Sequence, residues 1–246
     1  MSTSPYHGLR GAVKDRTCGS AGAAAAEAFG LARRTVVTDY DRLGMTVGEA
    51  MFTQRSIRRF RPDPIPLADL RLVLEAAVRA PNGGNRQIAR FLVVTDRERI
   101  ARFGTLYHEA WWAKRRDELG WTGPQDIPPD ATNYRAAAGL ADHMRDVPCV
   151  VLAFAEPPGW ANSILPACQN LMLAARALGL GSIPTTLHPS VMARVCALFG
   201  VPAELTFHFC IPLGYPAEGA HFGGSRRRPT RETVYLDHWG GPVPWA

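Results

Sequence analysis

The sequence predicts a single domain of mixed helix and strand, α/β or α+β, and two observations favour this class. Short stretches rich in β-branched or apolar residues alternate along the chain with longer stretches of helical period. The chain has 246 residues, of which 46% are hydrophobic and 20% charged. That composition is ordinary for a globular domain, and the length allows one substantial core.

The helices are indicated by apolar periodicity and by signals at their ends. Thr46 followed by Glu49 is a capping box that opens the first helix. In the second helix the apolar residues form one stripe, and Pro81 stops it. Helices are expected over residues 46–55, 67–80, 97–118, 131–145, 162–181 and 189–200.

The strands are shorter and differ in how apolar their two faces are. Residues 90–96 are β-branched, and residues 147–156 are apolar on both faces, which predicts a fully buried strand. Residues 182–187 are a short strand or a loop. Residues 204–216 alternate apolar and polar side chains at their start, as a strand does. The segment from Gly219 to the end has aromatic residues but no period, so we expect it to pack on something, such as a second subunit.

The first 44 residues have a different composition from the rest. Gly, Ala, Ser and scattered charges dominate, and no sustained apolar period begins before Thr46. Such a segment buries too little apolar surface to offset the entropy of ordering. We expect residues 1–44 to be a low-complexity, disordered N-terminal tail and residues 45–246 to form the domain. Met45 is a candidate for the natural start.

Charge and cysteine content limit the classes of partner. The net charge is +6, and arginine supplies nearly all of the basic residues. This surplus suits phosphate, but it does not choose between nucleic acid and a phosphorylated small molecule. The five cysteines have neither zinc-site nor disulfide-framework spacing, and their odd number suggests reduced thiols. No apolar run approaches the roughly 18 residues that span a membrane, so we expect a soluble, cytoplasmic protein.

Two arginine clusters stand at the two ends of the predicted domain, and each is followed closely by proline. They could meet around one anion, or they could be two solvated basic turns. The first cluster follows the helix that begins at Thr46, and the second precedes Pro229. Their members are Arg55, Arg58, Arg59 and Arg61, and Arg226, Arg227 and Arg228.

Two loops between these clusters carry polar or glycine-rich backbone. APNGGNRQ, residues 80–87, offers amide donors and acceptors to a ligand, although alone it is an ordinary Gly/Asn turn. GLGSIPTT, residues 179–186, follows a helix and lacks a third glycine, which excludes a Rossmann dinucleotide fingerprint. Pro184 removes one backbone N–H and leaves those of Thr185, Thr186 and Leu187 to pair with strands or a ligand.

The order of these pieces resembles the FMN-dependent nitroreductase family over residues 46–240. RSIRRF comes first, then APNGGNRQ, NLMLAARALGLGSIPTT, IPLGYP, and RRRPT before a terminal WG. The resemblance implies an α+β nitroreductase-like fold, with a central, mainly antiparallel sheet flanked by helices, in an intertwined homodimer. FMN would lie at the subunit interface.

The resemblance also implies a role for each motif. Arg55, Ser56, Arg58, Arg226 and Arg227 would hold the FMN phosphate through charge-assisted bonds. A polar loop of the partner subunit would touch the ribityl chain and ring, and backbone N–H groups after Pro184 would face N5. The remaining cofactor-binding residues implied are Asn82, Gly83, Asn85, Pro184, Thr185, Thr186 and Leu187.

The implied reaction is a ping-pong oxidoreduction that uses FMN. NADPH or NADH would reduce the flavin, and a nitroaromatic, a quinone or a related small-molecule acceptor would reoxidise it. N5 of FMN carries the hydride, so no catalytic side chain and no metal are required. Four positions depart from the family pattern and bear on flavin binding and potential: Gln54, Ile88, Ala89 and Thr186.

Alternatives on the same scaffold are a flavin-processing enzyme, a reductive dehalogenase and a partner in deazaflavin biosynthesis. A basic nucleic-acid-binding module is disfavoured because the arginines stand at proline turns and not among aromatic residues. We therefore expect neither a nucleic-acid nor a membrane partner. The aromatic residues Phe103, Tyr107, Trp111 and Trp112 could stack a substrate or fill the core, and Asn170 is expected to be a helix-packing amide.

Overall fold

The computed structural model describes residues 39–245, and the statements below concern that part of the chain. Residues 39–44, which belong to the segment expected to be a tail, group with the rest of the described chain in one compact unit. A 3-10 helix over Asp39–Arg42 precedes the first α-helix, and the Arg42 guanidinium pairs with the buried carboxylate of Asp69. The disorder expected for residues 1–38 lies outside the described residues.

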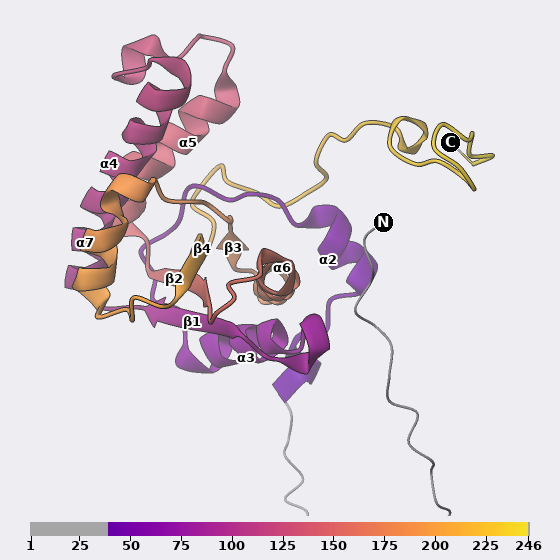
Figure 1. Cartoon of the computed structure of the whole chain (residues 1–246), viewed down its shortest axis with the longest axis horizontal. Coiled ribbons are helices and arrows are strands. Elements are labelled where there is room, and N and C mark those ends of the chain that lie inside the picture. The colour runs from indigo at the N-terminus through magenta and orange to yellow at the C-terminus, as the bar shows by residue number, and fades with distance from the viewer. Residues whose placement is uncertain (1–38, 246) are drawn as a thin grey trace, which may run out of the picture. The chain divides into compact units, whose positions relative to one another are not determined.

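One four-stranded sheet forms the centre of the fold (Figure 1). Its strands are β1 (Ala89–Val94), β2 (Cys149–Ala155), β3 (Gly181–Ser182) and β4 (Thr206–Gly214). They stand in the order β1-β2-β4-β3, and every neighbouring pair is antiparallel. All residues of β2 are buried, as the sequence predicted for a strand with two apolar faces.

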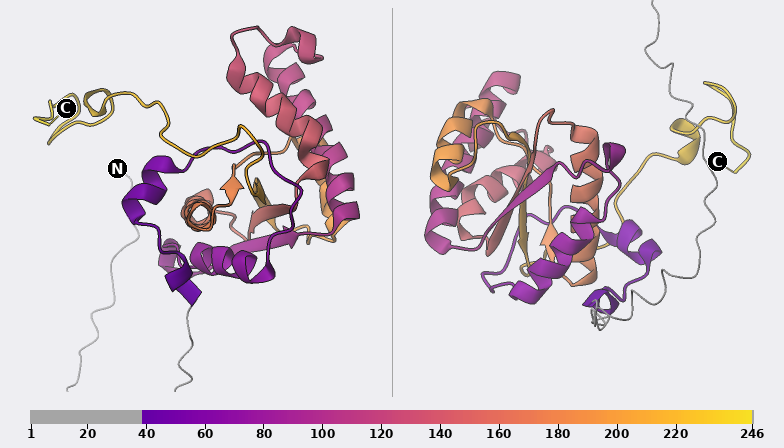
Figure 2. Two further views of the ribbon diagram at one scale, coloured as in Figure 1. Left: turned by 180° about the vertical axis from the view of Figure 1, so that it is seen from behind. Right: turned by 60° about the horizontal axis from the view of Figure 1, so that its bottom comes forward.

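Helices cover both faces of this sheet, and each face has its own core (Figure 2). On one side α3 (Leu67–Val78) and α6 (Ala161–Ala177) pack together, with α2 (Val47–Thr53) against α6. On the other side lie α4 (Arg97–Leu119), α5 (Thr132–His143) and α7 (Pro189–Phe199). Alternate β2 residues enter the two cores because successive side chains of a strand point to opposite faces. The predicted α+β class and antiparallel sheet are confirmed.

Local signals act at the helix ends as the sequence predicted. The Thr46 hydroxyl accepts a hydrogen bond from the Glu49 N–H at 3.1 Å, which caps α2, although this helix ends at Thr53 and not near residue 55. In the middle of α6 the amide of Asn170 donates to the Ala76 carbonyl at 3.2 Å. That bond fixes α6 against the last turn of α3 and confirms the packing role expected for this amide.

The helices α4 and α5 form a hairpin that projects beyond the sheet (Figures 1 and 2). Gly120 ends α4 in the left-handed conformation, with φ of 72°, which glycine adopts without strain. In the connecting turn the Asp126 carboxylate accepts hydrogen bonds from the N–H and hydroxyl of Thr122 and from the Gly123 N–H. These bonds lower the pKa of Asp126 and hold the turn closed.

The segment after α2 runs beside both β3 and the chain that leaves β4. The Ile57 N–H donates to the Ser182 carbonyl at 3.1 Å, and the Arg61 N–H donates to the Tyr215 carbonyl at 2.8 Å. Further on, the Gly223 N–H donates to the Thr53 carbonyl at 2.9 Å. Residues 53–61 therefore lie beside residues 215–223. Within the described range no helix is both long and apolar enough to cross a membrane.

Candidate functional site

Arg55 and Arg58 bring two positive charges to the strip beside β3. Arg55 is exposed, and its Nη1 lies 3.4 Å from Nε2 of His221. Arg58 is half-buried, and its buried Nε has no hydrogen-bond partner within residues 39–245. Burial is the main cause that lowers the pKa of Arg58, and the like charge of Arg55 lowers it further. Neither guanidinium forms an ion pair with a described carboxylate.

The second arginine cluster begins three residues after Gly223, which is hydrogen-bonded to Thr53. Three extended residues span at most about 10 Å. This limit allows Arg226 to approach Arg55, but no contact between the two clusters is described within residues 39–245, so their meeting stays a prediction. Both side chains are exposed, and the one hydrogen bond described for them is from Arg227 Nη1 to the Arg226 carbonyl at 3.0 Å.

The loop from Pro184 to Leu187 lies next to this strip, because Ser56 forms a parallel β-bridge with Ser182. Thr185 exchanges both backbone hydrogen bonds with Cys210 at 2.8 Å, so its N–H belongs to the sheet and is not free for a ligand. No described residue accepts a hydrogen bond from the backbone N–H of Thr186 or Leu187. Two consecutive donors thus remain at the edge of the sheet.

Tyr107 of α4 lies beneath this loop and links it to Arg58. The side chain is buried beside Thr185, and burial raises the pKa of its hydroxyl well above the ordinary value. Arg58 and Arg115 lie close enough for their charges to oppose that rise. Tyr107 and Phe103 are core residues, so the packing role considered for them is the one observed.

Lys114 is a neighbour of the site that the sequence did not single out. Its ammonium Nζ lies 3.4 Å from the hydroxyl of Thr186, and Glu118 lies 3.9 Å away on the same helix. The two residues are 72 positions apart, so no local spacing could have predicted the contact. The one signal available was that Lys114 is one of only two lysines in the chain.

The polar loop at residues 82–87 is folded on itself at the start of α6. The Asn82 side chain accepts a hydrogen bond from the Gln87 N–H at 2.8 Å, and the Gly83 N–H donates to the Ser163 hydroxyl at 3.2 Å. Asn85 takes a positive φ of 54°, a conformation that asparagine tolerates better than most residues. The loop is thus held in one shape with the Asn85 side chain exposed.

The strip beside β3 that carries Arg55 and Arg58 is called the arginine strip below. The loop and this strip lie at opposite ends of α6. Ser163 is in the first turn of the helix, whereas Arg176 in its last turn donates to the Thr53 hydroxyl at 3.0 Å. A helix of 17 residues is about 25 Å long. A single chain therefore keeps Asn82, Gly83 and Asn85 away from the arginine strip.

Comparison with known proteins identifies the family of this chain. The profile of the Nitroreductase family matches residues 52–215. The chain belongs to the nitroreductase family. The NADH dehydrogenase of Thermus thermophilus is 33% identical over 203 residues, which are 75% of this chain and 93% of that protein.

The chain also matches most of the length of two further proteins. The iodotyrosine deiodinase of Thermotoga neapolitana is 29% identical over 66% of this chain and 84% of that protein. The FMN-dependent nitroreductase NfnB of Mycobacterium smegmatis, solved with NADPH, has a TM-score of 0.60 at 24% identity and covers 81% of this chain and 100% of that one. The predicted nitroreductase-like fold is therefore confirmed.

Proposed function

We propose that this member of the nitroreductase family is an FMN-dependent oxidoreductase. NADH or NADPH reduces the flavin, and a small electron acceptor reoxidises it. The observation that carries the proposal is the strip beside β3, where Arg55 and Arg58 have no carboxylate partner within the described domain and two backbone N–H groups remain free.

The residues present fit a flavin mononucleotide. A phosphate monoester needs several donors with positive charge, and guanidinium groups supply these as bidentate pairs. Arg55, Ser56 and Arg58 would hold the phosphate from one side, and Arg226 and Arg227 would reach it from the C-terminal segment. The buried, unpartnered Nε of Arg58 supports this assignment, because a buried donor without an acceptor is costly.

The ring system would lie against the loop after Pro184. There the N–H groups of Thr186 and Leu187 would donate to it, while the Thr185 N–H is held in the sheet and fixes the loop. When bound, FMN supplies a carrier of hydride at N5. The chain binds and orients it, and Lys114 adds a positive charge at the Thr186 end of the site.

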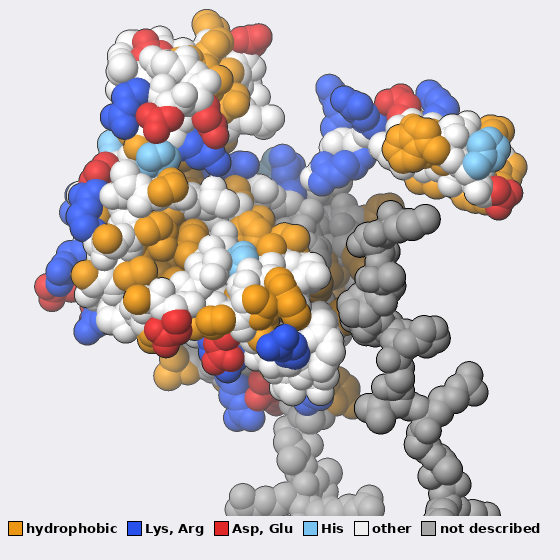
Figure 3. Space-filling model, viewed as in Figure 1, with side chains coloured by type: hydrophobic (Ala, Val, Ile, Leu, Met, Phe, Trp, Pro, Cys, Tyr) orange, Lys and Arg blue, Asp and Glu red, His pale blue; other side chains and the backbone are white. Residues whose placement is uncertain are grey.

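A homodimer is part of this proposal. Two copies related by a twofold axis would bring residues 82–85 of one chain to the arginine strip of the other, which the length of α6 prevents within one chain. Large apolar side chains stay exposed on the domain, and in Figure 3 hydrophobic side chains also gather at the end of the C-terminal segment. Such exposed groups are typical of interfaces. They include Val47, Met51, Phe52, Leu67, Leu165, Tyr235, Leu236, Trp239 and Trp245.

We propose that the reaction takes place in the cytoplasm. The class of electron acceptor has two candidates. Nitroaromatics and quinones are the first candidate, supported by membership of the family. Reductive dehalogenation is the second, supported by the deiodinase relative from Thermotoga neapolitana. Product analysis with a nitroaromatic, a quinone and a halophenol separates them, because only the last substrate releases halide.

A spectrum tests the flavin directly. The purified protein is expected to be yellow, and its flavin absorbance should bleach when NADH or NADPH is added without oxygen. Addition of an acceptor should restore the absorbance. A colourless protein that FMN cannot reconstitute would exclude the proposed function.

A further inference from the structure

The C-terminal segment is tied to the rest of the domain at residues 221–223, just before the second arginine cluster. The guanidinium carbon of Arg176 lies 4.1 Å from the centroid of the Phe222 ring. The Gly223 N–H donates to the Thr53 carbonyl at 2.9 Å. Residues 221–223 are called the anchor below. They fix the C-terminal segment to the end of α2 and to the last turn of α6.

The anchor also contacts the arginine strip. Nη1 of Arg55 lies 3.4 Å from Nε2 of His221. After the anchor, no hydrogen bond or ion pair links residues 224–228 to the remainder of the described chain. The anchor is therefore the last polar tie before Arg226 and Arg227.

Arg176 has its donors directed at the chain itself. Its Nε donates to the Thr53 hydroxyl at 3.0 Å, and its Nη2 lies 3.8 Å from the Glu49 carboxylate. The side chain is only 13% exposed, and the Phe222 ring covers its guanidinium. A cation that has lost much of its water is attracted more strongly to an aromatic face. The contacts of Arg176 thus fit a residue that holds Phe222, and not one that binds a phosphate directly.

A tie at the anchor limits where the second arginine cluster can go. Arg226 follows Gly223 by three residues, which span at most about 10 Å when extended. A segment that is already tied loses less conformational freedom when its side chains bind a ligand. The tie therefore raises the effective concentration of Arg226 and Arg227 at an anion held by Arg55.

We propose that the Arg176–Phe222 pair positions Arg226 and Arg227 for the phosphate of FMN. The pair is a positioning element, which increases the affinity for FMN without touching the cofactor. This proposal rests on the proposed function, since it concerns the phosphate end of the same flavin site.

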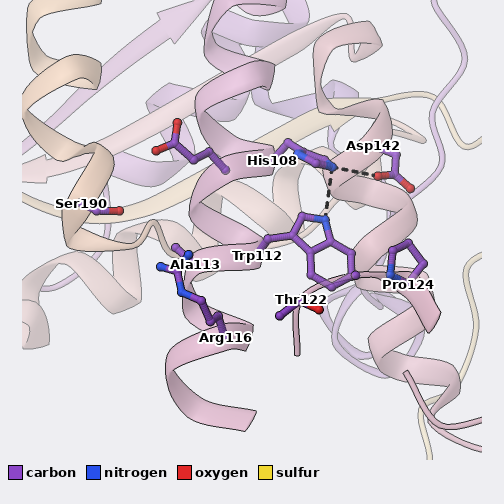
Figure 4. A pocket seen from close by; sticks show the side chains of 10 residues that line it. His108, Trp112, Ala113, Arg116, Thr122, Pro124, Asp142 and Ser190 are labelled. Carbon is purple, nitrogen blue, oxygen red and sulfur yellow. Dashed lines mark hydrogen bonds and ion pairs between the residues drawn. The ribbon is translucent and has the colours of Figure 1, made fainter. Parts of the chain in front are cut away.

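A cavity of about 590 Å³ supplies a control position (Figure 4). Its lining comes from α4, the turn that follows, α5 and α7, and includes no residue of the anchor. The carboxylates of Glu109 and Asp142 line it and would repel a phosphate. Trp112 in its wall and Phe222 in the anchor are both partly exposed, and both lie outside the two hydrophobic cores. Trp112→Ala is therefore a matched control for Phe222→Ala.

The test measures the dissociation constant of FMN by fluorescence titration of the full-length apoprotein. Phe222→Ala should weaken FMN binding about fivefold, which is the effect of losing one cation–π contact. Phe222→Tyr keeps an aromatic face for Arg176 and should bind FMN as the wild type does. Trp112→Ala should also bind FMN with wild-type affinity.

A double-mutant cycle shows whether the pair acts through the arginines. When Arg226 and Arg227 are both replaced by Ala, Phe222→Ala should cause no further loss of affinity. An equal loss in both backgrounds would mean that Phe222 supports the site in another way, and this would overturn the proposal. So would wild-type affinity of Phe222→Ala, failure of Phe222→Tyr to restore binding, or an equal loss in Trp112→Ala.

The wild-type protein separates this failure from failure of the proposed function. A wild-type protein that FMN cannot reconstitute, or whose flavin NAD(P)H does not bleach, contradicts the proposed function itself. A wild-type protein that binds reducible FMN, together with a Phe222→Ala variant that binds it equally tightly, contradicts only the inference about the anchor.

Discussion

The charged guanidinium of Arg58 is half-buried and therefore partly desolvated. Burial lowers its pKa, Arg55 repels it, and its Nε has no acceptor in the part of the chain described. Each of these effects costs stability unless an anion is bound. Sites that bind tightly often accept such a cost in the free protein, and FMN would relieve it.

Replacement of Arg227 by Ala should weaken FMN binding. Loss of one charge-assisted hydrogen bond costs about 1.5–3 kcal/mol, which is about 10- to 150-fold in dissociation constant. Fluorescence titration of the apoprotein with FMN measures it. Arg231→Ala is the matched control, because this exposed arginine lies beyond Pro229 on the same segment. Equal retention by both variants would remove Arg227 from the phosphate site.

The buried thiols should make the fold sensitive to alkali. Burial raises the pKa of Cys149 and Cys168 to about 12 from an ordinary value of 9.0. Above pH 9 the unfolded chain therefore loses protons that the folded chain keeps. The free energy of unfolding falls with rising pH up to about 12, by at most about 1.4 kcal/mol per pH unit for each thiol.

Urea unfolding between pH 8 and 10.5 checks this effect. The Cys168→Ala variant should lose less stability per pH unit than the wild type, whatever its stability at pH 8. The same change at Cys196, which is partly exposed, should leave the slope as it is. A slope that Cys168→Ala does not alter would contradict the burial effect.

The residue types of the proposed site could be predicted from the sequence, but the contacts between these residues could not. Clustered arginines before prolines predicted an anion site, because guanidinium chemistry is local to the side chain. The contact of Lys114 with Thr186 and the position of Tyr107 beneath Thr185 depend on how α4 packs on the sheet. Nothing in the spacing of residues so far apart in the chain records that packing.

At the scale of elements, α4 lies very close to the backbone that follows α5. Gly104 of α4 packs against the backbone of Arg145, where an added Cβ would lie 2.5 Å from Cα. Gly104→Ala should therefore destabilise the fold by about 1–3 kcal/mol through overpacking. Thermal or urea unfolding measures the change.

The opposite change in stability is expected at Gly139 of the neighbouring helix α5. It lies inside α5, and an added Cβ would meet nothing within 4 Å. Gly139→Ala should stabilise the protein by about 0.5–1 kcal/mol, because alanine loses less conformational entropy in a helix. If Gly104→Ala and Gly139→Ala destabilise the protein equally, then packing at Gly104 and helix propensity at Gly139 do not explain the stability of the two variants.

Elements were predictable to the degree that their signals are local. The capping box at Thr46, the stop at Pro81 and the doubly apolar β2 each act within a few residues, and these elements appear where expected. The strand order β1-β2-β4-β3 was not readable from such signals, because it is set by long-range pairing. The resemblance to the nitroreductase family supplied the antiparallel sheet.

At the scale of the whole molecule, the domain alone leaves the proposed site in two halves. The arginine strip and the loop at Asn82–Asn85 lie at opposite ends of α6, about 25 Å apart along the helix. An FMN site that uses both halves requires two chains. Light scattering should then give a mass about twice the 26.9 kDa of one chain.

Mixed dimers decide whether each flavin site uses both subunits. Arg55→Ala removes a phosphate contact, and Asn85→Gly removes the loop side chain while it keeps the positive φ. In a heterodimer with one change in each chain, a shared site places both lesions at one flavin and leaves the other site intact. That heterodimer should hold one FMN with wild-type affinity.

The arrangement in cis should give the reverse result. When both changes lie in one chain and the partner chain is wild type, shared sites carry one lesion each, so both bind FMN weakly. Differently tagged chains, co-expressed and purified as heterodimers, allow FMN per dimer to be counted from absorbance. A site built from a single chain would retain one tightly bound FMN in the cis heterodimer and none in the trans heterodimer. Because the two models predict opposite outcomes in the same pair of samples, that result would refute the shared site even if the protein is a dimer.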